Sequence, residues 1–431
     1  MPTLPFKPLP TAIAVAITLL IWLAIPLPEG LTSDAWLMLA IFVGTIAAII
    51  GKAMPIGAIS IIAIAIVAAS GVTSDNPGTA INDALSSYSN SLIWLIAISI
   101  MISRGLIKTG LGARIGYYFI SIFGKKTLGI GYSLAFSELC IAPVTPSNTA
   151  RGGGIMHPIM RSIAKGFDSR PEDGTSSKIG KYLALVNYHS NPITSAMFVT
   201  ATAPNPLTVE LISIATGAEI QLSWMTWALA MLLPGLVAIL AMPYILYLLY
   251  PPDIKQTPHA TQMARDKLAE MGKISRDEGI MLFVFLVLLL LWADIPALFM
   301  GDSVTLNTTT SAFIGLSILL LTGVLTWDDV LAEKNAWDTL LWFGALIMMA
   351  TQLNQTGLID WFSTNMQDWI TMMGIGWMGA SALLVLTFLY THYFFASTTA
   401  HITAMMAAFL TVGLTLGAPP MPFVLIMAAT S

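Results

Sequence analysis

Hydrophobic runs of about 20 residues, long enough to cross the roughly 30 Å of a bilayer's hydrocarbon, recur along the whole chain. Shorter polar segments separate these runs. We predict membrane-spanning helices at residues 11–27, 35–50, 55–71, 91–108, 224–250, 279–299, 305–325 and 338–359, with the start of another at 418–430. The pattern therefore predicts an all-α polytopic membrane protein.

Three further apolar stretches carry polar or proline-rich interruptions that a lipid-facing helix could not hold, because unpaired backbone groups are too costly in lipid. They are residues 127–164, interrupted at 143–154; residues 377–410, interrupted near Ser397; and residues 180–213, interrupted at 191–192 and again at 204–206. We expect broken helices at these places.

The distribution of positive charge predicts which side of the membrane each segment faces, since Lys and Arg collect on the cytoplasmic side. With a cytoplasmic N-terminus, 18 of the 19 Lys and Arg residues fall in segments predicted to lie inside. The predicted outside segments hold acidic residues and no cation; they are 28–34, 72–90, 207–223, 300–304 and 360–376. This assignment requires that 127–164 enters and leaves on the inside and 377–410 on the outside. Both are therefore predicted to be re-entrant hairpins.

Two hairpins of opposite sidedness indicate an inverted-topology repeat. The tip sequence Ser-Asn-Thr-Ala-Arg at 147–151 aligns with Ser-Thr-Thr-Ala-His at 397–401, at a constant offset of 250 positions. The predicted organisation is an N-terminal span (1–34), a first repeat (35–250), a charged cytoplasmic linker (251–278) and a second, incomplete repeat (279–431).

Composition supports a membrane protein and excludes several other classes. Hydrophobic residues make up 56% of the 431 residues and charged residues 10%, against roughly 45–50% and about 25% in soluble domains. A net charge of −4 argues against a nucleic-acid partner, which needs many cations. The single cysteine, Cys140, offers neither a disulfide nor a metal site, and we expect no metal or cofactor.

The N-terminal segment lacks both a signal-peptide cleavage site and the Arg- and Ser-rich character of an organelle transit peptide. We therefore expect a multi-pass protein of the bacterial inner membrane.

The two hairpin tips are the candidate binding site. Helix N-termini aimed into a cavity present unpaired N–H groups and a positive dipole end, which favour anions. Hydroxyl and amide side chains add neutral hydrogen bonds that can hold a carboxylate and still release it. The candidate ligands are Ser147, Asn148, Thr149, Ser397, Thr398 and Thr399. The alternative for the first tip alone is an ordinary helix N-cap.

The longer string Pro-Val-Thr-Pro-Ser-Asn-Thr-Ala-Arg-Gly-Gly-Gly at 143–154 resembles the divalent anion/sodium symporter (DASS) family. Together with Asn-Tyr-His-Ser-Asn at 187–191 and the second tip, it is most similar to the exchanger branch. That branch contains bacterial citrate/succinate and tartrate/succinate antiporters and plastid 2-oxoglutarate/malate translocators. The resemblance implies a homodimeric, elevator-type carrier with one substrate site per protomer between the two tips.

Two departures from the family pattern stand out. Thr398 replaces an asparagine of the second motif, which puts amide donation from that tip in doubt. The family also continues into a second broken helix and a final span, so the chain is expected to be an incomplete member at its C-terminus.

Arg151 and His401 occupy equivalent tip positions and are expected to replace the sodium ions that neutralise the substrate in sodium-coupled relatives. The alternatives are an Arg151 side chain that extends to the membrane interface and an interior His401 with satisfied hydrogen bonds. Glu138 either seals the hairpin by hydrogen bonding or couples protons. Further candidates near the hairpin and the following breaks are Asn191, Thr202, Pro204 and Asn205.

The sequence thus favours a secondary active transporter that exchanges malate, succinate, 2-oxoglutarate and, as a further candidate, citrate. The alternative within transport is sodium-coupled dicarboxylate symport, in which sodium would be bound. A third class, an intramembrane enzyme, lacks support because no nucleophile and base, or paired aspartates, fall together within the spans.

Overall fold

The computed structural model describes residues 6–301, 305–372, 374–395 and 398–431. These residues form helices and no strand; one isolated β-bridge joins Lys126 and Gln256. Within the described part of the chain, five segments are long and apolar enough to cross a membrane: α2 (Ser33–Ile50), α5 (Ser91–Thr109), α7 with its following turn (Thr127–Val144), α11 (Trp224–Leu249) and α20 (Thr398–Thr415). The all-helical prediction is confirmed.

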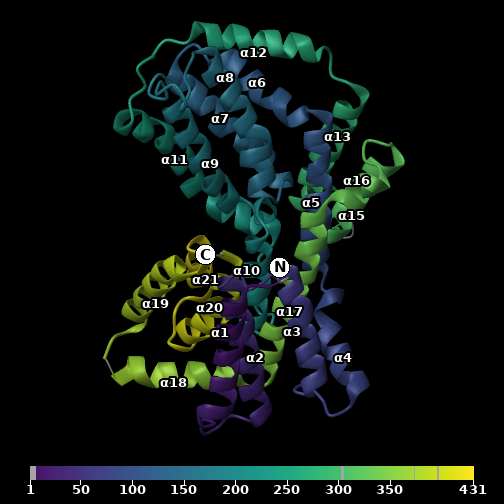
Figure 1. Cartoon of the computed structure of the whole chain (residues 1–431), viewed down its shortest axis with the longest axis vertical. Coiled ribbons are helices and arrows are strands. Elements are labelled where there is room, and N and C mark those ends of the chain that lie inside the picture. Colours follow the sequence, from purple (N-terminus) through teal and green to yellow (C-terminus); the bar gives the residue numbers. More distant parts are fainter. Residues whose placement is uncertain (1–5, 302–304, 373, 396–397) are drawn as a thin grey trace. The chain divides into compact units, whose positions relative to one another are not determined.

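The helices group into two compact units, whose elements are labelled in Figure 1. Unit 1 comprises Met1–Trp94, Pro206–Leu222 and Trp337–Ser431, and unit 2 comprises Leu95–Asn205 and Ser223–Ala336. Helices α5, α10 and α17 each pass from one unit into the other.

In unit 1, neighbouring helices pack pairwise, α1 with α2, α2 with α3, and α18 and α19 with α20. Asn76 caps α4 by accepting the backbone N–H groups of Gly78 and Thr79. Besides α2 and α20, the helices are α1 (Pro8–Leu19), α3 (Ile56–Ser70), α4 (Pro77–Leu85), most of α10 (Pro204–Ala215), most of α17 (Lys334–Gln355), α18 (Leu358–Met372), α19 (Trp377–Thr391) and α21 (Pro420–Ala429).

Unit 2 is built around α7 and α9, which pack against each other, and α11 packs against both. The amphipathic α6 packs on α7 and on α12. Besides α5, α7 and α11, the helices are α6 (Leu111–Phe123), α8 (His157–Gly166), α9 (Gly180–Met197), α12 (Pro258–Met271), α13 (Arg276–Trp292), α14 (Ile295–Met300), α15 (Thr308–Leu321) and α16 (Trp327–Ala332).

Both ends of the stretch 127–164 lie against the charged linker, residues 251–278. At its start, the Thr127 N–H donates to the carbonyl of Lys255 at 3.1 Å. Just past its end, the ring of Phe167 packs edge-on against His259, with 6.0 Å between centroids. Figure 1 shows α6, α7 and α8 gathered beneath α12 in this unit. The segment is therefore a hairpin whose two ends are held by the same linker.

Several predicted helix limits need correction. The prediction of one helix over 279–299 is wrong, because α13 ends at Trp292 and Asp294 adopts a left-handed conformation with φ of 51° before α14 begins. Pro296 then lies in the first turn of α14, where a proline, which has no N–H, is tolerated. Segment 360–376, predicted only as an outside connection, is largely helical and forms α18.

The predicted break at 191–192 is absent. Helix α9 runs through Pro192 and is interrupted only at 198–203, where a single 3₁₀ turn precedes α10 at Pro204. Proline inside a helix removes one hydrogen bond and normally costs about 3 kcal/mol. The side chain of the neighbouring Asn191 contacts the hairpin, as described below.

Candidate functional site

The first hairpin tip is a buried turn followed by an unusually wide helix. Helix α7 ends at Ile141, and residues 142–146 are buried. The second arm of the hairpin, residues 148–166, we call the descending arm. The Ser147 hydroxyl accepts the backbone N–H of Ala150 at 3.2 Å, so Ser147 acts as the N-cap of this arm. That arm opens with a π-helix, Thr149–Met156, and continues as α8.

The sequence of the descending arm explains why it opens as a π-helix. Pro158 lies in the first turn of α8 and has no N–H to donate to the preceding turn, a condition that favours a π-bulge. Gly152 permits close approach of α9. A Cβ atom on Gly152 would lie 2.9 Å from the amide nitrogen of Asn191.

Arg151 is fully buried inside this tip and does not reach the surface of the unit. Its Nε donates to Glu138 at 3.0 Å, and one terminal nitrogen donates to the carbonyls of Thr145 and Ala201 at 2.6 and 2.8 Å. The other terminal nitrogen donates to Ser195 and, more weakly, to Asn148. An arginine has five N–H donors, so each one has an acceptor.

Glu138 is the negative partner of this ion pair. One carboxylate oxygen accepts from both Arg151 and the side-chain amide of Asn191. The second oxygen, Oε2, is buried and has no hydrogen-bond partner in the described part of the chain. The Asn191 amide also donates to the carbonyl of Asn148 at 3.3 Å. Glu138 and Asn191 therefore tie α7, the tip and α9 together.

The two most exposed residues of the tip are Asn148 and Thr149. The hydroxyl of Thr149 forms no hydrogen bond within the described residues. The Asn148 side-chain oxygen lies 2.7 Å from the hydroxyl of Ser195, which leaves its amide N–H₂ group directed away from these contacts. Both residues can therefore donate to a ligand.

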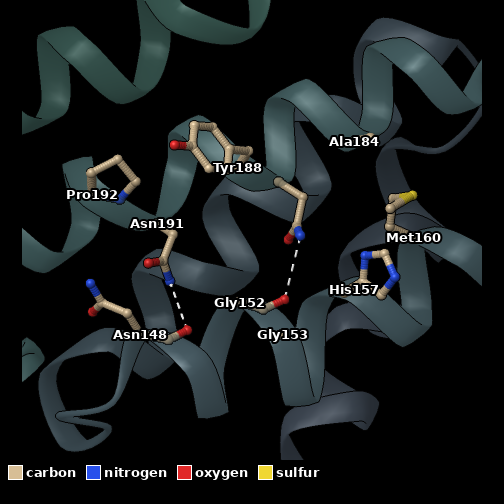
Figure 2. Close-up of a pocket in the computed structure, with 10 residues that line it drawn as sticks. Asn148, Gly152, Gly153, His157, Met160, Ala184, Tyr188, Asn191 and Pro192 are labelled. Carbon is tan, nitrogen blue, oxygen red and sulfur yellow. Dashed lines mark hydrogen bonds between the residues drawn. The ribbon is translucent and has the colours of Figure 1, made fainter. Parts of the chain in front are cut away.

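A cavity of about 490 Å³ runs from the tip along the groove between the descending arm and α9. Figure 2 shows Asn148 and Asn191 at one end of this cavity and His157 with Met160 at the other. Asn187 also lines it and donates to the carbonyl of Gly152 at 3.4 Å. Its side-chain oxygen is buried and has no hydrogen-bond partner among the residues that the structure describes. We call this space the tip cavity.

Sequence reasoning missed Ser195 and gave Asn187 no role. Both lie on the face of α9 that carries Asn191, at spacings of four residues. Polar residues four apart on a mainly apolar helix share one face, which was the available signal.

The candidates around the interruption have different roles. Asn205 is buried, and its amide donates to the carbonyls of Ser195 and Phe198, both at 2.8 Å, so it closes the end of α9. Pro204 begins α10, and the Thr202 carbonyl accepts the Asn205 N–H at 3.3 Å. These residues shape the backbone near the tip and do not line the tip cavity.

The second tip belongs to unit 1. Ser397 lies outside the described residues, whereas Thr398 begins α20 and Thr399 is buried in its first turn. His401 is buried, and its Nε2 lies 3.1 Å from the Thr391 hydroxyl. The ring of His392, which sequence reasoning did not single out, lies 4.8 Å from that of His401.

Among the described residues, no group of three or more His, Cys, Asp and Glu side chains gathers at metal-binding distance. The tip contains exposed hydrogen-bond donors and a paired buried charge.

Comparison with known proteins identifies the family. The sequence profile described as the sodium:sulfate symporter transmembrane region matches residues 7–431. The chain belongs to the divalent anion/sodium symporter family. This member is 49% identical over 425 residues to YflS of Bacillus subtilis (strain 168), which is named as a malate transporter; the match covers 99% of the chain and 85% of YflS.

Two further relatives carry dicarboxylate names. The family member is 43% identical to dicarboxylate transporter 1 of the spinach chloroplast, over 96% of the chain and 70% of the relative. It is 35% identical to the L-tartrate/succinate antiporter of Escherichia coli (strain UTI89 / UPEC), over 98% and 86%.

Solved structures support the fold alone. The transporter MtrF of Neisseria gonorrhoeae aligns with a TM-score of 0.53 at 14% identity, covering 98% of this chain and 84% of MtrF. The YdaH transporter of Alcanivorax borkumensis aligns with a TM-score of 0.52 at 12% identity, covering 87% and 85%. The family assignment and the helical fold together describe a helical membrane transporter.

Proposed function

We propose that this family member exchanges dicarboxylate anions such as malate, succinate and 2-oxoglutarate across the bacterial inner membrane, with citrate as a further candidate. Three relatives named for malate, dicarboxylate and tartrate/succinate transport support the substrate class. The observation that carries the proposal is the exposed Asn148, which lines the tip cavity, with the exposed Thr149 next to it in the chain.

Exchange is favoured over sodium-coupled uptake by the position of Arg151. Sodium binds to several oxygen atoms that converge on an open volume. Here the oxygens of Thr145, Ala201, Ser195 and Glu138 converge on a guanidinium group. The guanidinium of Arg151, which is attached to the chain, thus takes the place that a sodium ion would occupy. We propose the same part for His401 at the second tip, with Thr398 and Thr399 contributing ligands.

The membrane arrangement follows from the same proposal. The two ends of 127–164 meet at one charged linker, which supports a re-entrant hairpin on the cytoplasmic side. We extend this to a second hairpin at 377–410, an inverted repeat, a cytoplasmic N-terminus and elevator-type alternating access in a homodimer.

The second candidate function is sodium-coupled dicarboxylate symport. The observation that favours it is the unpaired, buried oxygen of Glu138, which offers one ligand to a small cation. In that case sodium would be bound during transport.

The test is uptake of labelled malate into proteoliposomes, with and without internal dicarboxylate and with and without a sodium gradient. We expect uptake only into vesicles loaded with dicarboxylate, unaffected by sodium. Accumulation into empty vesicles driven by sodium would assign the chain to symport.

Matched variants locate the site. Asn148→Ala and Thr149→Ala each remove a ligand hydrogen bond worth about 1–3 kcal/mol near a charged group, so exchange should fall by about tenfold or more. Asn82, an exposed asparagine of α4, provides the control, and Asn82→Ala should exchange like the wild type. Equal activity of all three variants would exclude the first tip as the site.

A further inference from the structure

A second cavity, of about 500 Å³, lies beside the tip cavity in unit 2. Its walls come from α8, the loop that follows it, and the start of α9. Four cations line it, Arg161 and Lys165 from α8, Arg170 from the loop and Lys181 from α9, against a single carboxylate, Glu172. We call it the basic groove.

Most of this positive charge is not neutralised by the protein. Among the described residues, Arg161, Lys165 and Lys181 form no ion pair, and all three are exposed. Arg170 approaches Asp168 at 3.8 Å. Arg161 and Lys165 are four residues apart on one helix, where like charges repel and destabilise the helix. The negative end of the helix dipole at the α8 C-terminus stabilises the charge of Lys165, which lies in the last turn. Arg161 lies more than one turn from this end and is stabilised less.

The loop that forms the far wall is held firmly by hydrogen bonds. The buried Ser169 hydroxyl accepts the N–H groups of Ile179 and Gly180. Across the same loop, the Thr175 hydroxyl lies 2.9 Å from the N–H of Arg170 and 2.7 Å from the carbonyl of Asp168. The linker adds to this, because the Asp253 N–H donates to the carbonyl of Ser177 at 3.1 Å. The cations are thus presented on an ordered frame.

The basic groove and the tip cavity are neighbours. They share the lining residues His157, Met160 and Ala184. An anion in the groove therefore lies next to the cavity that Asn148 lines.

We propose that the basic groove is a second anion-binding station, at which a dicarboxylate binds before it passes to the tip. This inference rests on the proposed function for its choice of ligand. A cleft lined by one sign of charge raises the local concentration of oppositely charged ligand, with gains of about 10- to 1,000-fold in association rate that fall with ionic strength. The groove can hold a dicarboxylate weakly and release it, because its cations are exposed and hydrated.

The test reads the potential of the groove directly and does not require transport. The native Cys140 is first replaced by serine, and a cysteine is placed at the exposed, shared position by Ala184→Cys. Purified protein in neutral detergent is labelled with an anionic and with an uncharged methanethiosulfonate reagent. We expect the anionic reagent to be favoured at low salt, and the ratio of the two rates to fall about tenfold in the double variant Arg161→Gln, Lys165→Gln.

High salt should abolish the preference, because the screening length falls from about 30 Å at 0.01 M to about 3 Å at 1 M. Lys273→Gln is the matched control: it removes one exposed cation of the linker that does not line the groove, and it should leave the ratio unchanged. Millimolar succinate should slow the labelling, and it should still do so when Asn148→Ala has disabled the tip.

Three results would overturn the proposal: no preference for the anionic reagent, a preference that survives the double variant, or protection by succinate only when the tip is intact. Protection by added phosphatidylglycerol but not by succinate would also overturn it and assign the groove to a lipid headgroup. Failure of the proposed function has a different signature, namely absent malate exchange with the anionic preference of the groove retained.

Discussion

Replacing Arg151 with alanine tests the buried ion pair of the first tip. Arg151 and Glu138 are both fully buried, and removal of the guanidinium leaves Glu138 with only the Asn191 amide as a donor. Breaking one side of a buried pair costs about 3–5 kcal/mol, because the remaining charge stays buried and uncompensated. The carbonyls of Thr145 and Ala201 lose donors as well, at up to about 1–3 kcal/mol each. We therefore expect a loss of at least about 3 kcal/mol in the free energy of unfolding.

The assay is reversible unfolding in mixed micelles with increasing dodecyl sulfate, followed by circular dichroism. Adding Glu138→Gln to Arg151→Ala removes the orphaned charge and should restore about half of the lost stability. Arg161→Ala, at an exposed position of α8, should change stability by less than about 0.5 kcal/mol. Wild-type stability of Arg151→Ala, or a further loss on adding Glu138→Gln, would refute the reasoning.

Three further predictions follow from other parts of the structure. Gly152→Ala should abolish malate exchange, because its Cβ would lie 2.9 Å from the Asn191 amide, whereas Gly153→Ala, whose nearest side-chain atom is 4.0 Å away, should exchange normally; equal activity would contradict the close packing. Lys108 and the Thr326 N–H lower the pKa of Asp329 to about 2, so the carboxylate adds stability above its ordinary pKa of 3.8 and loses it as the pH falls towards 2. Asp329→Asn should therefore lower the melting temperature equally at pH 5 and pH 8, with the difference from wild type vanishing near pH 2, and a difference that grows with acid would show the opposite sign. In a Cys140→Ser background, Asp75→Cys should react with an impermeant thiol reagent from outside intact cells and Lys273→Cys only after permeabilisation; reversed labelling would overturn the proposed topology.

Hydropathy predicted the long helices closely because a span must be both apolar and about 20 residues long. The predicted limits 91–108 and 224–250 lie within a residue of α5 and α11. Local rules failed where tertiary contacts decide the outcome. Pro192 signals a break, yet α9 continues through it, and the neighbouring Asn191 binds Glu138 and the tip. Segment 360–376 was read from its charges alone, although most of it is helical.

For the candidate site, the sequence located the first tip but not the interactions within it. Of Ser-Asn-Thr at 147–149, Asn148 and Thr149 are exposed, Asn148 lines the tip cavity, and Ser147 caps a helix. The pairing of Arg151 with Glu138, 13 residues earlier, depends on how the hairpin closes, and no periodicity encodes it. The roles of the remaining tip residues stay predictions for transport assays.

The linker that holds the hairpin is synthesised well after the hairpin itself. The carbonyl of Gly124 accepts the hydroxyl of Thr257, 133 residues later in the chain, and the hydroxyl of Thr127 donates to the carbonyl of Ile254, 127 residues later. At about 5–20 residues per second, ribosomes take roughly 7–27 s to make the intervening chain. Throughout that interval, the Gly124 carbonyl and the Thr127 hydroxyl lack the partners that Thr257 and Ile254 later supply. A slower ribosome would lengthen this interval in proportion.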